Sequence, residues 1–135
     1  MTDRALVDEI VTLLWGGDEA RVSTIVDPGY RDHAAAGAGR GPHGFRAERE
    51  AFRRAFADVE VSAHDFLLAG GRAAVRLRFR GLHVGPYAGL EPCGRTVEWE
   101  EIHLWRMDGG RLVEHWACRD DLAALRRMGA DLRWP

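Results

Sequence analysis

The chain has 135 residues, of which 46% are hydrophobic and 30% are charged, which is typical of one globular domain over residues 1–135. Its net charge is −2 at pH 7, and acidic and basic residues alternate along it, so we expect no nucleic-acid partner and no basic membrane-binding patch. The first ten residues carry charges and no apolar run reaches the length of a membrane span, which predicts a cytoplasmic protein without membrane contact.

The composition also limits the chemistry of the protein. All 19 basic side chains are arginine, so reactions that need a lysine, such as Schiff-base or P-loop chemistry, are excluded. Cys93 and Cys118 match no zinc or haem spacing, and the six histidines contain no HxH or HExxH pair. We therefore expect no bound metal.

The N-terminal half of the chain predicts three helices. Apolar residues recur at helical spacing over residues 6–14, behind Thr2 and Asp3 and before Gly16. A shorter amphipathic helix is predicted over residues 18–26 and a third over residues 42–57. Between these two, residues 30–33 are expected to be extended and residues 34–41 to form a glycine-rich loop.

Beyond residue 57 the hydrophobic period changes from about 3.6 residues to 2. This change predicts four strands in meander order over residues 59–68, 73–82, 95–106 and 112–119, followed by a helix over residues 122–128. Three helices before such a meander indicate an α+β fold. We expect a cone-shaped α+β barrel in which the helices pack on a strongly curved antiparallel sheet and enclose a pocket.

The predicted strand over residues 95–106 carries an uncommon set of side chains. Its alternation places Trp99, Glu101, His103 and Trp105 on one face. If this face lines a pocket, the low dielectric moves the pKa of Glu101 or His103 toward neutrality, where either group can transfer a proton. The alternative is an exposed strand face whose aromatic residues lie in an oligomer interface.

The register of the last hairpin decides which partner shares this face. Across the turn at residues 108–110, His103 is expected opposite residue 116 or 117. The first register brings in Trp116 and the second brings in His115. On the other face, Glu98 and Glu100 are expected to form ion pairs with arginines of the preceding strand.

Two other places hold candidate residues. Asp32 and His33 lie where the helical region meets the sheet, and a turn or capping role is the alternative for Asp32. His83 follows a predicted strand and is expected at the mouth of the pocket, with an ordinary surface position as the alternative.

Several segments together resemble the SnoaL-like polyketide cyclase (ester cyclase) family of the nuclear-transport-factor-2-like superfamily. They are GLHVGPYAGLEPCGR at residues 81–95, IHLWR at 102–106, DGGRLVEHW at 108–116, YRDH at 30–33 and GPHG at 41–44. The resemblance implies a cofactor-independent pocket enzyme acting on a small hydrophobic or aromatic, polyketide-type substrate. It also implies a homo-oligomer, either a homodimer or a homotetramer.

The resemblance further implies where the site lies. In the cyclases, an aspartate on the last strand is the acid and base of an aldol ring closure, assisted by a histidine that corresponds to His103. The aspartate position holds Ala117, which has no proton to give. Glu101 and Asp32 stand where the cyclases have amides, and Trp15 stands at a pocket aromatic. We therefore predict that Glu101 and Asp32 are the catalytic acid and base groups, with His103 as their partner.

These observations predict a tailoring enzyme of polyketide-type secondary metabolism that transfers protons in an apolar pocket, in a cyclase- or hydroxylase-like reaction. The alternatives are an epoxide-opening or isomerase-type enzyme, and a non-catalytic small-molecule binding or partner subunit. The side chains expected to contact the substrate are Trp15, His33, His83, Trp99, Trp105, Trp116 and Ala117.

Overall fold

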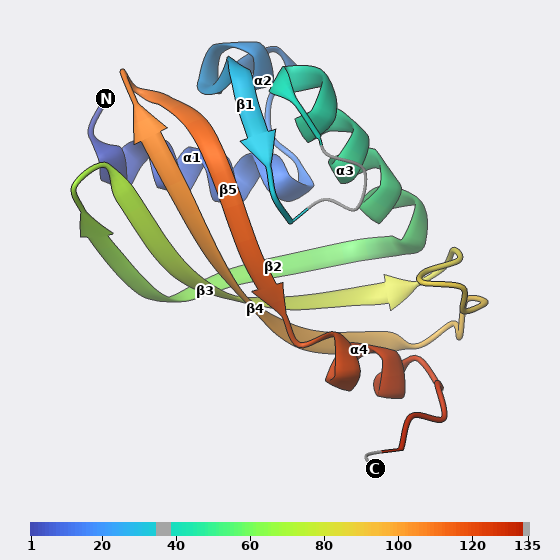
Figure 1. The fold of residues 1–135 in the computed structure, drawn as a ribbon. Helices are drawn as coiled ribbons and strands as arrows, with labels where there is room; N and C mark the ends of the chain where they lie inside the picture. Colours follow the sequence, from blue (N-terminus) through green and yellow to red (C-terminus); the bar gives the residue numbers. More distant parts are fainter. Residues whose placement is uncertain (35–38, 134–135) are drawn as a thin grey trace.

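The computed structural model describes residues 1–34 and 39–133, which form four helices and five strands. Part of the predicted glycine-rich loop, residues 35–38, lies outside the described residues. The elements follow one another as α1 (Asp3–Trp15), α2 (Glu19–Ile25), β1 (Val26–Asp32), α3 (Gly41–Ala55), β2 (Phe56–Ala69), β3 (Arg72–His83), β4 (Thr96–Asp108), β5 (Arg111–Arg119) and α4 (Asp121–Arg127) (Figure 1).

The helices begin where the sequence provides caps. The Thr2 side chain accepts a hydrogen bond from the first turn of α1, and Asp18 and Asp120 do the same for α2 and α4. The prediction of a third helix to residue 57 is wrong by two residues, because Phe56 begins β2. The helical spacing of apolar residues continues across this boundary, at Phe45, Phe52 and Phe56, so periodicity in the sequence does not show where the helix ends. None of the described helices is long and apolar enough to cross a bilayer.

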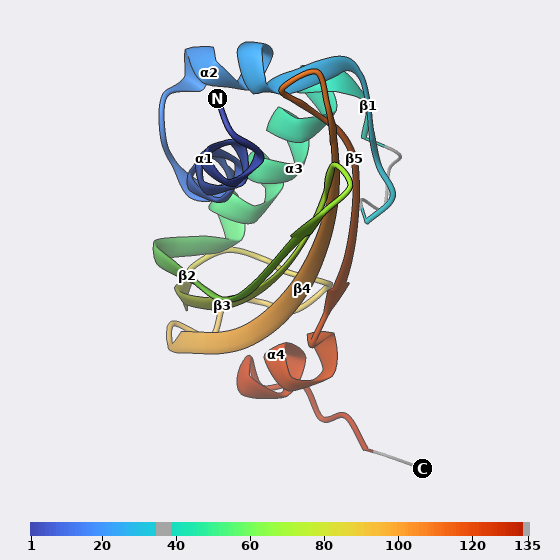
Figure 2. The same cartoon turned by 90° about the vertical axis from the view of Figure 1, so that its left-hand side faces the viewer.

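The five strands form one sheet in the order β1-β5-β4-β3-β2. The meander from β2 to β5 is antiparallel, as predicted, but β1 pairs in parallel with β5. The expected antiparallel sheet is therefore a mixed sheet, because the extended segment before α3 joins its edge. The sheet curves strongly around α1 and α3 and does not close into a barrel (Figure 2).

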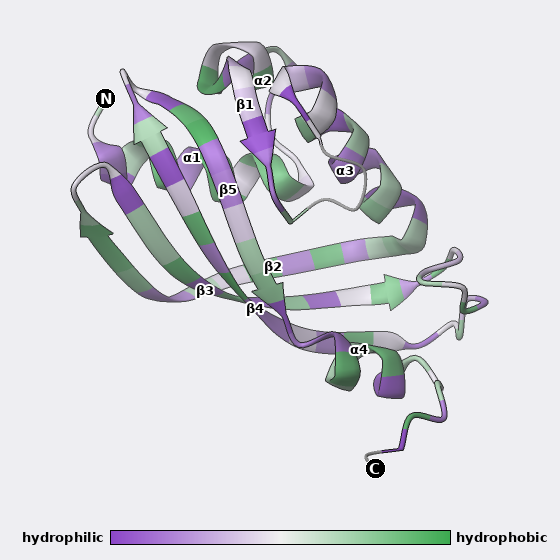
Figure 3. Cartoon of the chain, viewed as in Figure 1, coloured by the Kyte–Doolittle hydropathy of each residue, from purple (hydrophilic) through white to green (hydrophobic). Residues whose placement is uncertain are grey.

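The strands alternate between a buried and an exposed face (Figure 3). The inner face of β4 carries Trp99, Glu101, His103 and Trp105, all at most 4% exposed, so the alternative of an exposed aromatic face is wrong. On the outer face, the predicted cross-strand ion pairs are present, with Glu100 2.9–3.0 Å from two arginines of β3 and Glu98 3.2 Å from a third. The inner face therefore supplies both the core and the candidate site.

Candidate active site

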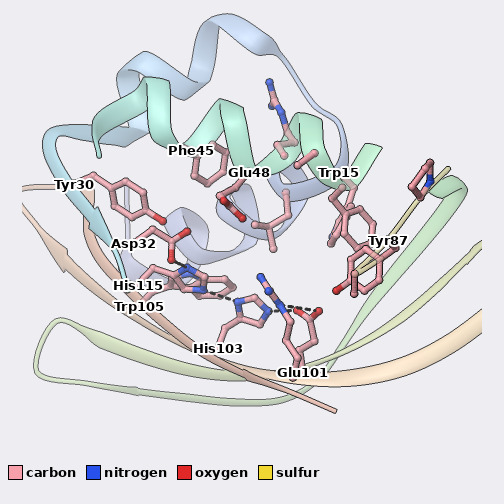
Figure 4. Close-up of a pocket in the computed structure, with 17 residues that line it drawn as sticks. Trp15, Tyr30, Asp32, Phe45, Glu48, Tyr87, Glu101, His103, Trp105 and His115 are labelled. Carbon is pink, nitrogen blue, oxygen red and sulfur yellow. Dashed lines mark hydrogen bonds and ion pairs between the residues drawn. The ribbon is translucent and has the colours of Figure 1, made fainter. Parts of the chain in front are cut away.

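A cavity of about 290 Å³ lies between the inner face of the sheet and the helices α1 and α3 (Figure 4). This volume is at the lower end of the range for small-molecule pockets. Aromatic and apolar side chains come mainly from the helices and the loop between β3 and β4, and ionisable ones mainly from the strands. The lining residues are Leu14 and Trp15 of α1, Phe45, Glu48, Arg49, Ala51 and Phe52 of α3, Pro86, Tyr87 and Ala88 of the loop, and Tyr30, Asp32, Glu101, His103, Trp105, His115 and Arg119 of the strands.

Four buried ionisable groups on the cavity wall form a continuous chain of short contacts. Asp32 Oδ1 lies 2.9 Å from His115 Nδ1, and His115 Nε2 lies 2.7 Å from His103 Nδ1. His103 Nε2 lies 2.7 Å from Glu101 Oε2, and the indole N–H of Trp99 donates to the other oxygen of Glu101 at 2.9 Å. We call the chain Asp32–His115–His103–Glu101 the carboxylate-imidazole relay. Both of its ends reach the cavity (Figure 4).

Strand pairing explains why these groups meet. The parallel pairing of β1 with β5 places Asp32 beside His115. On the antiparallel side, His103 pairs with Ala117, which is the second of the two predicted registers. Side chains two residues apart on a strand share a face, so His115 lies diagonally across from His103. Ala117 places a single methyl group opposite His103, and the two imidazole rings lie edge to edge in nearly one plane, 9° apart, with centroids 4.9 Å apart.

Each end of the relay has further polar partners. Glu101 pairs across the strands with Arg119, whose Nε lies 3.3 Å from its carboxylate. Asp32 accepts a hydrogen bond from the backbone N–H of Ala34, at 2.9 Å. Charge-assisted hydrogen bonds of this kind hold a carboxylate in its ionised form.

The pKa values follow from competition between burial and these contacts. Burial alone would raise the pKa of Glu101, but the hydrogen bond and charge of His103 and the charge of Arg119 lower it below the ordinary value. In the same way, His115 outweighs burial and lowers the pKa of Asp32. Burial lowers the pKa of His103. The expectation of a Glu101 or His103 poised near neutrality is therefore wrong, and at neutral pH Glu101 is ionised and His103 neutral.

Counting protons shows what the relay holds. Three hydrogen bonds join its four groups, so they require three protons, whereas two neutral imidazoles supply one each. With His103 neutral, its Nε2–H donates to Glu101 and its Nδ1 accepts from His115. The hydrogen bond between His115 and Asp32 then needs one proton beyond those of two neutral imidazoles. The fully hydrogen-bonded relay therefore has the ionised Glu101 at one end and this third proton at the other.

The structure brings five of the residues singled out in the sequence to the cavity wall, namely Trp15, Asp32, Glu101, His103 and Trp105. These residues come from α1, β1 and β4.

The other five do not line this cavity. Trp99 is buried beside it and contacts Glu101. Ala117 lies opposite His103 in the sheet, as described above. His33 stacks on Trp116 outside the cavity, with ring centroids 4.9 Å apart.

His83 is also absent from the cavity lining, although it was expected at the mouth. Its side chain is fully buried and its Nδ1 accepts a hydrogen bond from the backbone N–H of Cys93. It therefore holds the base of the loop between β3 and β4, which carries Tyr87 to the cavity.

Sequence reasoning missed several residues that line the cavity. His115 was one of two alternatives, and only the register could select it. Arg119 follows from the same register, because it pairs with Glu101. Tyr30 stands two residues before Asp32 on an edge strand, and Tyr87 stands in a loop, so neither carried a periodic signal. Glu48 falls at helical spacing between Phe45 and Phe52, which is a signal that the sequence did contain.

In the part of the chain that the structure describes, no set of side chains is arranged for metal or thiol chemistry. No group of three histidine, cysteine, aspartate or glutamate side chains there is placed to hold a metal ion. Cys93 and Cys118 are free thiols. The ionisable groups of the cavity are instead bonded to one another.

Comparison with known proteins gives a consistent result. Residues 5–128 match the profile of the SnoaL-like polyketide cyclase family. The aklanonic acid methyl ester cyclase DnrD of Streptomyces peucetius is 30% identical over 97 residues, which are 71% of this chain. That stretch is 66% of the length of DnrD, just under two thirds.

Solved structures share the fold. TsrD from Streptomyces laurentii superposes with a TM-score of 0.84 and 27% identity over 94% of each chain. A SnoaL-like polyketide cyclase from Agrobacterium tumefaciens superposes with a TM-score of 0.81 and 21% identity, over 96% of this chain and 99% of its own. At that identity the second likeness concerns the fold alone.

Proposed function

This chain belongs to the SnoaL-like polyketide cyclase family, and from that premise we propose that it is a tailoring enzyme for a polyketide-type aromatic ketone. In this proposal one end of the carboxylate-imidazole relay removes a proton from the substrate and the other end delivers a proton to it. The observation that supports the proposal is the unbroken contact from Asp32 to Glu101 along the wall of an aromatic cavity.

Glu101 is the base in this proposal. It is ionised, it faces the cavity, and Trp99 and Arg119 hold its carboxylate in place. A carbon next to a ketone loses its proton to Glu101, and the electron pair of that C–H bond passes to the ketone oxygen as an enolate. The protonated Glu101 is in contact with His103, so the relay then holds four protons instead of three.

Asp32 is the acid end. The enolate carbon attacks a second carbonyl, a C–C bond forms, and the carbonyl electron pair becomes an alkoxide on oxygen. The third proton, between His115 and Asp32, passes to this alkoxide. The original state returns when Glu101 releases its proton to water and the contact between His115 and Asp32 takes one up. One C–H bond is broken while one C–C and one O–H bond are formed. In this proposal the relay takes the role of the single cyclase aspartate whose position Ala117 occupies.

Deuterium exchange tests the base without requiring the natural substrate. The wild-type protein is expected to replace the methyl hydrogens of 2-acetonaphthone with deuterium in D₂O, followed by NMR. Glu101→Gln should slow this exchange by about 10²- to 10⁴-fold, the range for loss of a general base. His115→Phe should also slow it, because His103 loses the hydrogen-bond donor that keeps its Nε2–H directed at Glu101.

Glu100→Gln is the matched control, since Glu100 is the next residue of β4 and faces outward. An unchanged rate in a folded Glu101→Gln protein would remove Glu101 from the mechanism. If the wild-type protein binds 2-acetonaphthone without exchanging its hydrogens, the alternative of a non-catalytic binding subunit is the better description.

A further inference from the structure

Glu48 is the carboxylate that α3 contributes to the cavity, beside aromatic side chains and the buried Arg49. It lies three residues after Phe45 and four before Phe52, so all three side chains share the stripe of the helix that faces the cavity. Figure 4 shows Glu48 projecting from α3 into the cavity, on the side opposite the relay. The helical side of the cavity therefore has one acidic group among aromatic ones.

Glu48 differs from the other two carboxylates of the cavity. Asp32 and Glu101 each accept hydrogen bonds from neighbouring side chains. In residues 1–34 and 39–133, no side chain forms a hydrogen bond or an ion pair with Glu48. A carboxylate in a partly apolar site is costly unless a donor satisfies it. A bound molecule with a hydroxyl group would provide that donor.

The position of Glu48 also fits a ligand that spans the cavity. Tyr30 lies at one end of the cavity and Tyr87 at the other, with Glu48 between them (Figure 4). Glu48 is thus central in the roof, whereas the relay forms the opposite wall. A planar ring system between them would present its carbonyl edge to the relay and another edge to Glu48.

We propose that Glu48 is a specificity-determining residue that accepts a hydrogen bond from a hydroxyl group of the aromatic substrate. This inference rests on the proposed function, because it names the class of substrate for the same cavity, a hydroxylated aromatic ketone. A methyl ether at that hydroxyl cannot donate and should bind more weakly.

A matched pair of ligands tests this directly. Calorimetric titration should show that the wild-type protein binds 6-hydroxy-2-acetonaphthone about ten-fold or more tightly than 6-methoxy-2-acetonaphthone, as expected for a hydrogen bond to a charged acceptor. In Glu48→Met, which keeps an apolar side chain of similar length, this preference should disappear because the affinity for the hydroxy compound falls. The affinity for the methoxy compound should not fall.

Two control variants make the result specific. Glu50→Met changes an exposed glutamate of the same helix, which pairs with Arg53, and should keep the preference. Glu101→Gln should also keep it while losing deuterium exchange, so a failure of the relay and a failure of Glu48 are distinguishable. An equal preference in wild type and Glu48→Met, or binding of neither ligand by the wild-type protein, would overturn the inference.

Discussion

At the scale of single residues, Ala117 explains how the relay differs from a site with one aspartate. It pairs with His103 across the β4–β5 hairpin, and its methyl group offers no acceptor to the imidazole. His103 is therefore bonded to Glu101 and His115 instead. The acid and base roles of our proposal are then divided between carboxylates on two different strands.

Placing an acid at position 117 should change the protonation of His103. In Ala117→Asp, a carboxylate opposite the imidazole favours its charged form, so the pKa of His103 should rise from its lowered value. NMR titration of the His103 ring signals measures this shift. Ala117→Asn, which has the same shape and no charge, should produce a smaller rise. Equal titration curves in the two variants would mean that the charge at position 117 does not reach His103.

At the scale of elements, a close approach between glycines positions the segment that carries Asp32. Gly44 lies in the first turn of α3, and a Cβ atom placed there would be 2.6 Å from the backbone carbon of Gly39. Gly39 in turn accepts the backbone hydrogen bond of Asp32, at 2.9 Å. The GPHG motif therefore allows α3 to pack against the backbone that holds the acid end of the relay.

Gly44→Ala should consequently disturb both stability and the site. The added methyl group overlaps backbone that cannot move alone, so we expect a loss of about 1–3 kcal/mol, measured by urea unfolding. The backbone amide signal of Asp32 should shift in the same protein. Gly16→Ala is the control, because a Cβ atom at Gly16 meets nothing within 4 Å. A fully stable Gly44→Ala protein with an unmoved Asp32 amide would contradict this account.

The elements also show which parts of the fold could be predicted from patterns in the sequence. The strands of the meander and the inner face of β4 were predictable. Alternation over ten or more residues allows only one of the two strand faces to pack on the core. The parallel pairing of β1 with β5 was not, since it joins segments more than 80 residues apart and leaves no local pattern. For that reason Asp32 and Glu101 were predicted separately, while the His115 link between them required the structure.

At the scale of the whole molecule, the relay makes folding depend on pH. The fold buries Glu101 and Asp32 with lowered pKa values, and it buries His103 with a lowered pKa as well. A group with a lowered pKa in the folded protein binds protons more readily when the chain is unfolded. Each of these groups therefore stabilises the fold at higher pH, and that stabilisation is lost as the pH falls.

The free energy of unfolding should accordingly decrease in two stages on acidification. The first begins as the pH falls through the ordinary histidine value of 6.5, because the unfolded chain then gains a proton on His103 that the folded protein resists. The second begins near the ordinary values of 4.5 for Glu101 and 3.8 for Asp32.

Urea unfolding of wild type and His103→Gln between pH 7.5 and 4 separates the contribution of His103 from those of other histidines. The variant lacks the titrating imidazole, so the difference in unfolding free energy between the two proteins should change between pH 7.5 and 5.5. The control is His64→Gln, which alters an exposed histidine of β2. The difference in unfolding free energy between this variant and the wild type should be near zero at every pH. A constant difference between wild type and His103→Gln would mean that folding does not lower the pKa of His103. A change in the opposite direction would mean that folding raises this pKa, and the third proton of the relay would then belong on His103 rather than between His115 and Asp32.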